Sequence, residues 1–202
     1  MIYKMVALKG FKRAIIGVYD EAGKKVINKF EFTRKDGEGG SVSADISGLA
    51  GEQIKLSAGD GDYYVAQAGV GDVKVKLTLM DLSDEIIAAI SGHKTEVSGL
   101  NAVGSNSVAP YCSLVLESTT LGEKPYYTGF SKGKFTIDSA KMETSETGKI
   151  NIESDTELEF GAISDENGDS YKYGTGADKF APMEKYAFPN FTGVAEKKLV
   201  GK

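Results

Sequence analysis

The stretch LTLMDLSDEIIAAISGH, Leu77–His93, changes its hydrophobic period halfway along and so joins two kinds of secondary structure. Extended back to Val73, its first half has apolar residues at every second position as far as Leu79. Such alternation places one face of a strand on a core and the other in water. The first half therefore predicts a half-buried strand.

The second half of the stretch predicts a short amphipathic helix over Asp84–Ser91. Ser83 is placed to accept hydrogen bonds from the free amides of the first turn, and Asp84 and Glu85 put negative charge at the positive end of the helix dipole. Gly92 suits the left-handed conformation that ends many helices. The face expected to pack on a sheet consists of Ile86, Ile87 and Ile90.

The composition favours a single domain that is rich in turns. The chain has 202 residues with 41% hydrophobic content, which is enough for one domain with a real core. Its 25 glycines are more than the usual share of about 7%, and tryptophan is absent. We therefore expect many turns and few helices.

Charge and targeting signals argue against several classes of protein. A net charge of -5 argues against a protein that grips duplex DNA with a basic face. The N-terminal MIYKMVALKG lacks the apolar core of a signal peptide, and no window approaches the roughly 18 uninterrupted apolar residues of a membrane span. We expect the product to carry no signal peptide, to remain in the cytoplasm after synthesis and to have no membrane partner.

Short strands separated by turns account for much of the remaining pattern. Ala14–Phe32 predicts a hairpin that turns at Asp20–Lys24, and QIKLSA and DYYVAQ, within Gln53–Gln67, predict two further strands. Asn167-Gly168 is the strongest hairpin-turn dipeptide, and SYKYG follows it as the answering strand. TEVSGLNAVGSNSV, after the helix, is expected to be a polar connection.

These patterns together predict the fold class. About eight to ten short strands and one confident helix indicate a mainly β protein, an antiparallel β-sandwich or barrel with one short flanking α-helix. We expect one β-rich domain over residues 1–176. A C-terminal extension over residues 177–202 is weakly patterned and carries no prediction of helix or strand.

The stretch RKDGEGGSVSADISGLAG, Arg34–Gly51, differs from its neighbours in composition. Glycines, charges and hydroxyls dominate it, with few apolar residues to anchor it. A connection of this length inside a compact domain is usually either functional or disordered. We therefore predict a long flexible loop with a role in function.

Residues that carry chemistry occur without the spacing that chemistry needs. Cys112, the only cysteine, alternates with Leu114 and Leu116, so it is expected to be a small buried hydrophobe. His93, the only histidine, follows the helix C-terminus, where capping is the expected role. No zinc-ligand spacing, nucleophile elbow or phosphate-binding loop occurs. We expect no catalytic residue, no cofactor and no metal site.

The middle of the chain contains an ordered series of segments. QIKLSAGDGDYYVAQA, a Gly-rich turn, an alternating strand and a short helix ending in Ile-Ser-Gly follow one another between Asp45 and His93. Pro110-Tyr111, SLVLES, YYTGFSKGKFTI and SDTELEFGAIS continue the series. In this order they resemble the major tail protein, or tail tube protein, of long-tailed, siphovirus-type phages of Gram-positive bacteria. The resemblance covers roughly Asp45–Ile163.

This resemblance implies a structural virion protein rather than an enzyme. Such subunits form rings, usually six-fold, that stack into a hollow tube through which viral DNA passes. Each is a β-sandwich with one helix on the outer side of a sheet, and neighbouring subunits line the bore with a continuous barrel. The implied partners are other copies of the chain, other tail proteins such as the tape measure, tip and terminator, and DNA only in passing. The implied location is the phage tail, after synthesis in the host cytoplasm.

The resemblance also gives the predicted loop a role. We hypothesise that it becomes ordered when it packs on the adjacent ring. The residues proposed for this contact between rings are Arg34, Lys35, Asp36, Glu38, Ser41, Ser43 and Asp45.

Other readings of the sequence stay open. A β-sandwich displayed on a surface could recognise carbohydrate or protein through aromatic side chains. The candidate aromatic residues are Tyr63, Tyr64, Tyr126, Tyr127, Tyr171 and Tyr173. An enzyme with a site that the sequence hides is a third reading. Within the tail class, an infectious phage, a defective prophage and a tail-derived bacteriocin are equally compatible.

Overall fold

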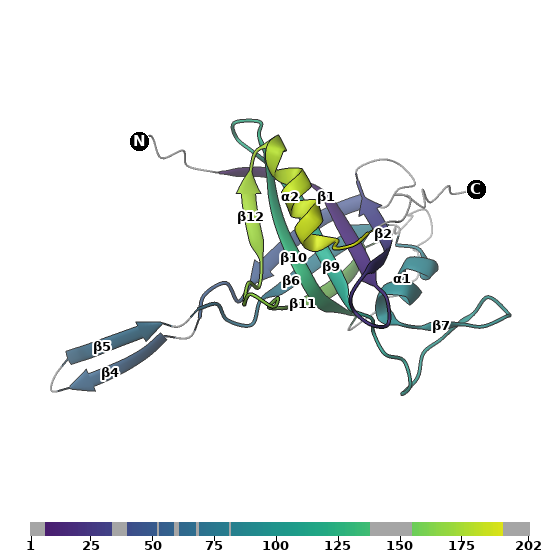
Figure 1. Cartoon of the computed structure of the whole chain (residues 1–202), viewed down its shortest axis with the longest axis horizontal. Coiled ribbons are helices and arrows are strands. Elements are labelled where there is room, and N and C mark those ends of the chain that lie inside the picture. Colours follow the sequence, from purple (N-terminus) through teal and green to yellow (C-terminus); the bar gives the residue numbers. More distant parts are fainter. Residues whose placement is uncertain are drawn as a thin grey trace, which may run out of the picture.

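The structure, a computed structural model, describes residues 7–33, 40–51, 53–58, 61–67, 69–80, 82–137 and 155–191 (Figure 1). It is mainly β, as predicted. The strands are β1 (Leu8–Tyr19), β2 (Val26–Phe32), β3 (Gly40–Ser47), β4 (Gln53–Ala58), β5 (Gly61–Gln67), β6 (Lys74–Met80), β7 (Lys94–Thr95), β8 (Asn101–Ala102), β9 (Cys112–Thr120), β10 (Pro125–Thr136), β11 (Asp155–Ile163) and β12 (Lys172–Thr175). The helices are α1 (Asp84–Ser91), the 3-10 turn η1 (Ala177–Lys179) and α2 (Phe180–Ala187).

One antiparallel sheet of eight strands curls into a barrel (Figure 1). Its main path runs β2-β1-β9-β10-β11-β6-β3, and β12 pairs with β10. The last strand, β3, returns to the side of β1, where the Ser41 hydroxyl donates to the Lys12 carbonyl oxygen at 3.4 Å. The antiparallel sandwich or barrel expected from the sequence is confirmed, as is the hairpin over Ala14–Phe32, which is β1 and β2.

The strand and helix predicted from Leu77–His93 both form. In β6 the alternate residues are buried, and α1 begins and ends at the expected positions. The Ser83 hydroxyl accepts a hydrogen bond from the Ile86 amide at 3.4 Å, and Gly92 has a φ of 68°. This φ lies in the left-handed region, which glycine adopts without steric cost.

Helix α1 packs on the inner side of the sheet, so the expectation that it covers the outer side was wrong. Ile86 and Ile90 are fully buried in the cluster that fills the barrel, together with Leu77 and Leu79 of β6. Ile87 is only half-buried. The chain turns from β6 directly into α1, which brings the helix across the open end of the barrel (Figure 1). The short helix expected beside the sheet is therefore present, and it packs against the barrel interior.

A second helix, α2, covers the outer face of β1, β9 and β10 (Figure 1). It lies in the C-terminal extension, where no element was predicted. No side chain caps its start, so the capping residue that usually marks a helix start is absent, and Pro182 in the first turn is compatible with the helix. The outer cluster contains the buried residues Ile15, Tyr19, Val26, Val115, Tyr127, Met183, Ala187 and Phe188.

The prediction of a long flexible loop over Arg34–Gly51 was wrong for its second half. Gly40–Ser47 forms β3, which pairs with β6 along its length. Ala44 and Ile46 pack on the barrel interior, whereas Val42 lies at a bulge and is exposed. Small polar residues give this strand little hydrophobic pattern, and the pairing with β6 stabilises it instead. Residues 34–39 lie outside the described residues.

The predicted hairpin at Asn167-Gly168 was also wrong, because β11 and β12 do not pair with each other. Both pair with the same edge of β10, where Lys132 faces Ile163 and Gly129 faces Lys172. They are two halves of one interrupted strand. The Asn-Gly turn lies in the excursion between the halves, where the Asp165 carboxylate accepts hydrogen bonds from the amides of Asn167 and Asp169. The turn at Asn167-Gly168 was therefore predicted correctly, but the pairing of the two strands that flank it was not.

Gly133 is predicted to be a site where even a methyl group destabilises the barrel. A Cβ there would lie 2.4 Å from the Gly161 carbonyl oxygen and 2.4 Å from the Phe160 ring, whereas a Cβ on Gly161 meets no atom within 4 Å. We expect Gly133→Ala to lower the free energy of unfolding by about 1 to 3 kcal/mol. The control Gly161→Ala should change it by less than about 0.5 kcal/mol. Urea unfolding followed by circular dichroism measures both, and equal effects would contradict the packing described.

The thiol of Cys112 is predicted to be unreactive in the folded chain. Its side chain is fully buried, as expected from the sequence, and burial raises the pKa of the thiol to about 12. Only the thiolate reacts with alkylating reagents, so at about pH 8 labelling should follow unfolding. Mass spectrometry with and without denaturant measures this. Rapid labelling of the native chain would show that β9 opens locally.

Candidate assembly surfaces

The segments that leave the barrel gather at its two rims. Because neighbouring strands run antiparallel, the start of β1, the β9–β10 turn and the connection from β3 to β6 leave one rim, which we call the Leu8 rim. The β1–β2 turn, α1 and the chain that follows α1 leave the other, the α1 rim (Figure 1). Each rim therefore offers surfaces that the barrel itself does not use.

At the Leu8 rim, β4 and β5 form a hairpin that extends away from the barrel (Figure 1). Its base is fixed by backbone hydrogen bonds from Gly71 to Gly48 at 3.0 Å and from Gly51 to Gly69 at 3.2 Å. A Cβ on Gly48 would lie 1.9 Å from the Asp72 carbonyl oxygen, so this crossing of two chain segments requires glycine. The two strands predicted here are confirmed as a paired unit outside the main sheet.

At the α1 rim, residues 94–108 form a projecting segment that we call the arm (Figure 1). The short strands β7 and β8 pair within it, and the Thr95 hydroxyl donates to the Asn101 side-chain oxygen at 2.8 Å. The sequence was interpreted here as a polar connection. Instead, the arm exposes four aliphatic side chains, those of Val97, Leu100, Val103 and Val108. The spacing of these four residues follows neither a helix nor a strand period, so their exposure could not be predicted from the sequence.

The outer faces of the barrel differ in what covers them. The face formed by β1 and β9 lies under α2, whereas no described helix covers the face formed by β3, β6 and β11. On this polar wall the Lys74 ammonium pairs with the Glu159 carboxylate at 2.9 Å, and the Ser43 hydroxyl donates to the Thr78 hydroxyl at 3.2 Å. Asp45 stands opposite Lys76 in the pairing of β3 with β6. Charges of both signs are thus interleaved on the wall.

The residues predicted to contact an adjacent ring are divided by the structure. Ser41, Ser43 and Asp45 lie on β3, beside one another at the start of the polar wall. The charged residues before them, Arg34, Lys35, Asp36 and Glu38, lie outside the described residues. Strand β3 therefore positions part of the predicted surface on the barrel wall rather than on a loop.

The tyrosines considered for ligand binding do not form one surface. Tyr127 is buried beneath α2, where its ring centre lies 5.4 Å from that of Phe180. Tyr126 and Tyr171 each lie beside Tyr173, with ring centres 6.3 and 6.1 Å from it. Nothing further is assigned to Tyr63 and Tyr64, which lie on β5. Most of these described rings therefore pack against each other or against the core.

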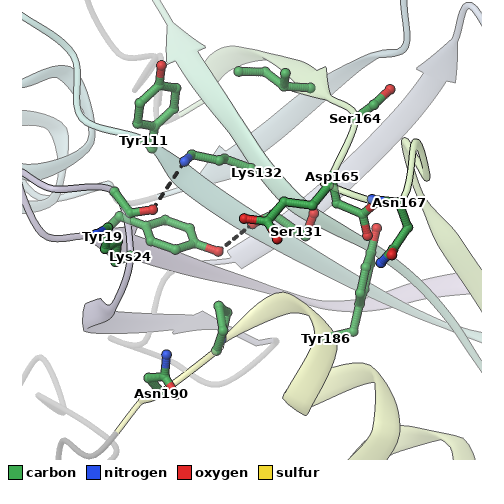
Figure 2. A pocket seen from close by; sticks show the side chains of 14 residues that line it. Tyr19, Lys24, Tyr111, Ser131, Lys132, Ser164, Asp165, Asn167, Tyr186 and Asn190 are labelled. Carbon is green, nitrogen blue, oxygen red and sulfur yellow. Dashed lines mark hydrogen bonds between the residues drawn. The ribbon is translucent and has the colours of Figure 1, made fainter.

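A cavity of about 690 Å³ opens between the β1–β2 turn, β10, the chain after β11 and the end of α2 (Figure 2). The Lys132 ammonium donates to the Gly23 carbonyl oxygen at 3.1 Å and lies 4.3 Å from the centre of the Tyr111 ring. The Tyr19 hydroxyl donates to the Ser131 carbonyl oxygen at 2.7 Å. Sequence reasoning missed this cavity because five separate segments form it, with Tyr111 before β9 as the fifth.

The chemistry of the cavity is that of fixed hydroxyls and ammonium groups. Tyr186 reaches from α2 toward Ser131 (Figure 2), and burial raises the pKa of both Tyr186 and Tyr19. Both phenols therefore stay neutral at neutral pH. The Tyr19 hydroxyl is hydrogen-bonded, whereas the buried Tyr186 hydroxyl has no hydrogen-bond partner among the described residues. Within the described residues, no three His, Cys, Asp or Glu side chains are grouped as metal ligands.

A barrel with helix-covered and uncovered faces, and with projecting segments at both rims, defines a structural subunit with surfaces for association. A family model described as phage tail tube protein matches residues 6–197, so the chain belongs to that family. It is a structural protein of the phage tail, the major tail subunit, as the resemblance in sequence implied. The family is structural rather than enzymatic and places the chain in the virion tail.

Two further observations accompany this assignment. A comparison with curated proteins returned no match. Within the part of the chain that the structure describes, no helix has the length and apolar character needed to cross a membrane.

The buried phenol of Tyr19 is predicted to make the fold sensitive to alkali. Burial raises its pKa from 10.0 to about 12, with smaller contributions from Tyr186 and Cys112. Between these values the unfolded chain releases the proton while the folded chain keeps it, so stability falls as pH rises. Tyr19→Phe should make this fall shallower by about 1.4 kcal/mol per pH unit. Urea unfolding across this pH range measures the slope.

The control for this experiment is Tyr173→Phe, because the Tyr173 side chain is 66% exposed. We expect its slope to match that of the wild-type chain. An unchanged slope in Tyr19→Phe would mean that the phenol at position 19 ionises as readily in the folded chain as in the unfolded one.

Proposed function

We propose that the chain assembles with copies of itself into rings, six-fold in the form that the resemblance implies, and that the rings stack into a hollow tube for the passage of DNA. The family match over residues 6–197 carries this proposal. The barrel supports it through its shape, because both rims bear segments that extend beyond the barrel wall. Other tail proteins, such as the tape measure, tip and terminator, are the proposed further partners.

Ring closure is assigned to the edge strands. In the main path of the sheet, β2 and β3 are the terminal strands, and β3 contacts β1 through Ser41 without a strand ladder between them. Strand edges without a ladder partner associate with other strands unless they are covered. A closed ring of subunits covers such edges in every copy. We therefore place the contacts between neighbours within a ring along β2 and β3.

The polar wall of β3, β6 and β11 is assigned to the bore. Its charges include both signs, as in the ion pair of Lys74 with Glu159. A surface without a net basic field attracts the phosphates of DNA weakly, which suits a conduit. The opposite face, under α2, then lies on the outside of the tube.

Contact between rings is assigned in part to the charged residues before β3 and to the start of that strand. They are Arg34, Lys35, Asp36, Glu38, Ser41, Ser43 and Asp45. Removal of the whole segment would also remove β3, which completes the barrel wall and pairs with β6. A test of the contact therefore has to alter side chains and leave the strand in place.

Assembly of the purified chain is the test of this function. Electron microscopy of the concentrated protein should show hollow tubes of uniform width, and light scattering should rise with concentration above a threshold. Lys35→Ser with Glu38→Ser should weaken stacking and leave folded rings, because it removes charges and keeps β3. The control, Asp178→Ser with Lys185→Ser, removes one charge of each sign from exposed positions near and on α2. A chain that stays monomeric at every concentration, even with tail tips added, would contradict the proposal.

A further inference from the structure

The arm, residues 94–108, combines exposed aliphatic side chains with a defined shape. Leu100 and Val103 are each 68% exposed, Val108 is 72% exposed, and Val97 is fully exposed. Single exposed aliphatic residues are ordinary on protein surfaces, but four within one short projecting segment are not. Such a segment indicates a surface that another protein covers.

Local contacts hold the arm in one conformation. A Cβ on Gly92 would lie 2.0 Å from the Val108 carbonyl oxygen, so the two ends of the arm pass in direct contact where only glycine fits. The Glu96 amide donates to the Leu100 carbonyl oxygen at 2.8 Å, and the Asn101 side-chain amide reaches the Asp84 carbonyl oxygen of α1 at 3.4 Å. The arm is therefore a compact loop with closely spaced ends, and little entropy is lost when it docks.

The opposite rim carries a matching apolar patch. Leu8 is 53% exposed and Leu121 is 67% exposed, and they lie together because the Leu121 amide donates to the Ala7 carbonyl oxygen at 2.9 Å. An exposed ion pair between Lys9 and Glu123 borders them. Strand β9 runs between the two rims, from Cys112, which follows the arm, to Thr120 beside Leu8 (Figure 1). The arm and the patch therefore face in opposite directions along the barrel.

We propose that the arm of one copy packs on the patch of Leu8 and Leu121 in the next copy, which joins subunits end to end. The inference rests on the proposed function, since it names the contact by which stacked subunits recognise one another. The two surfaces are different and lie at opposite rims, so the contact is heterologous and leaves a free arm and a free patch after every addition. Each surface is apolar with balanced charge at its border: Lys94 and Glu96 on the arm, Lys9 and Glu123 at the patch. Each surface thus has one charge of each sign at its border.

Serine substitutions test whether the two surfaces act in the same step. The double change Val97→Ser and Leu100→Ser, and separately Leu121→Ser, should each raise the threshold concentration for tubes at least tenfold while rings remain visible. Ile163→Ser is the matched control, because Ile163 is also an exposed aliphatic residue, 44% exposed, and lies at the end of β11, away from both surfaces and from the edge strands β2 and β3. Thermal unfolding of each variant shows whether the fold is retained. Tubes that form at the wild-type threshold from both arm and patch variants would overturn the contact.

Disulfide cross-linking tests the pairing directly. Cys112 is fully buried, so cysteines introduced at the surface are the accessible thiols. A chain with Val97→Cys and Leu121→Cys should form a ladder of covalent multimers when assembled tubes are oxidised, whereas either change alone should form none. The pair Val97→Cys and Ile163→Cys is the control. Tubes without a ladder overturn this contact and leave the proposed function in place; a wild-type chain that forms no assembly overturns the proposed function as well.

Discussion

Two strands that are buried on both faces set the architecture of the subunit. In β1 every residue of Ala14–Tyr19 is buried, and in β9 every residue of Cys112–Glu117 is buried. A strand of this kind needs an apolar cover on each side, because burial of apolar surface is the main favourable term in folding. The barrel interior supplies one cover and α2 supplies the other. The position of α2 therefore follows from the sequence of strands that lie far before it in the chain.

Because β9 is buried on both faces, the carboxylate of Glu117, which is 2% exposed, needs positively charged partners. Its carboxylate forms ion pairs with Arg13 and Lys12, and Arg13 also pairs with Glu31. A buried carboxylate without such partners is costly. The Arg13 guanidinium in turn lies 4.7 Å from the centre of the Phe180 ring, at the start of α2. The charges that neutralise the buried carboxylate thus also attach the outer helix. The attachment leaves the opposite wall free for contacts outside the subunit.

Elements whose hydrophobic period and caps lie within their own sequence could be predicted. Elements that are stabilised by a partner far away in the chain could not. Strand β6 and helix α1 carry their own period and caps, so both were predicted with correct ends. Strand β3 has mostly small polar residues and exists because β6 pairs with it. Helix α2 lacks a side-chain cap and is stabilised by the outer face of the sheet. The cavity and the arm could not be predicted for the same reason. The cavity is built from five separate segments, and the exposure of the arm depends on the fold.

A subunit joined through different surfaces at its two rims forms a directional polymer, because every copy must point the same way. Each addition regenerates the same free surface, so the contact energy of the last subunit equals that of the first. Such a contact does not depend on how many subunits have already been added. The length of a tube built in this way has to be set by a component that spans many subunits or blocks one end. In the proposed assembly, control of length therefore falls to other proteins, and the tasks proposed for this chain are ring closure, stacking and a bore of balanced charge.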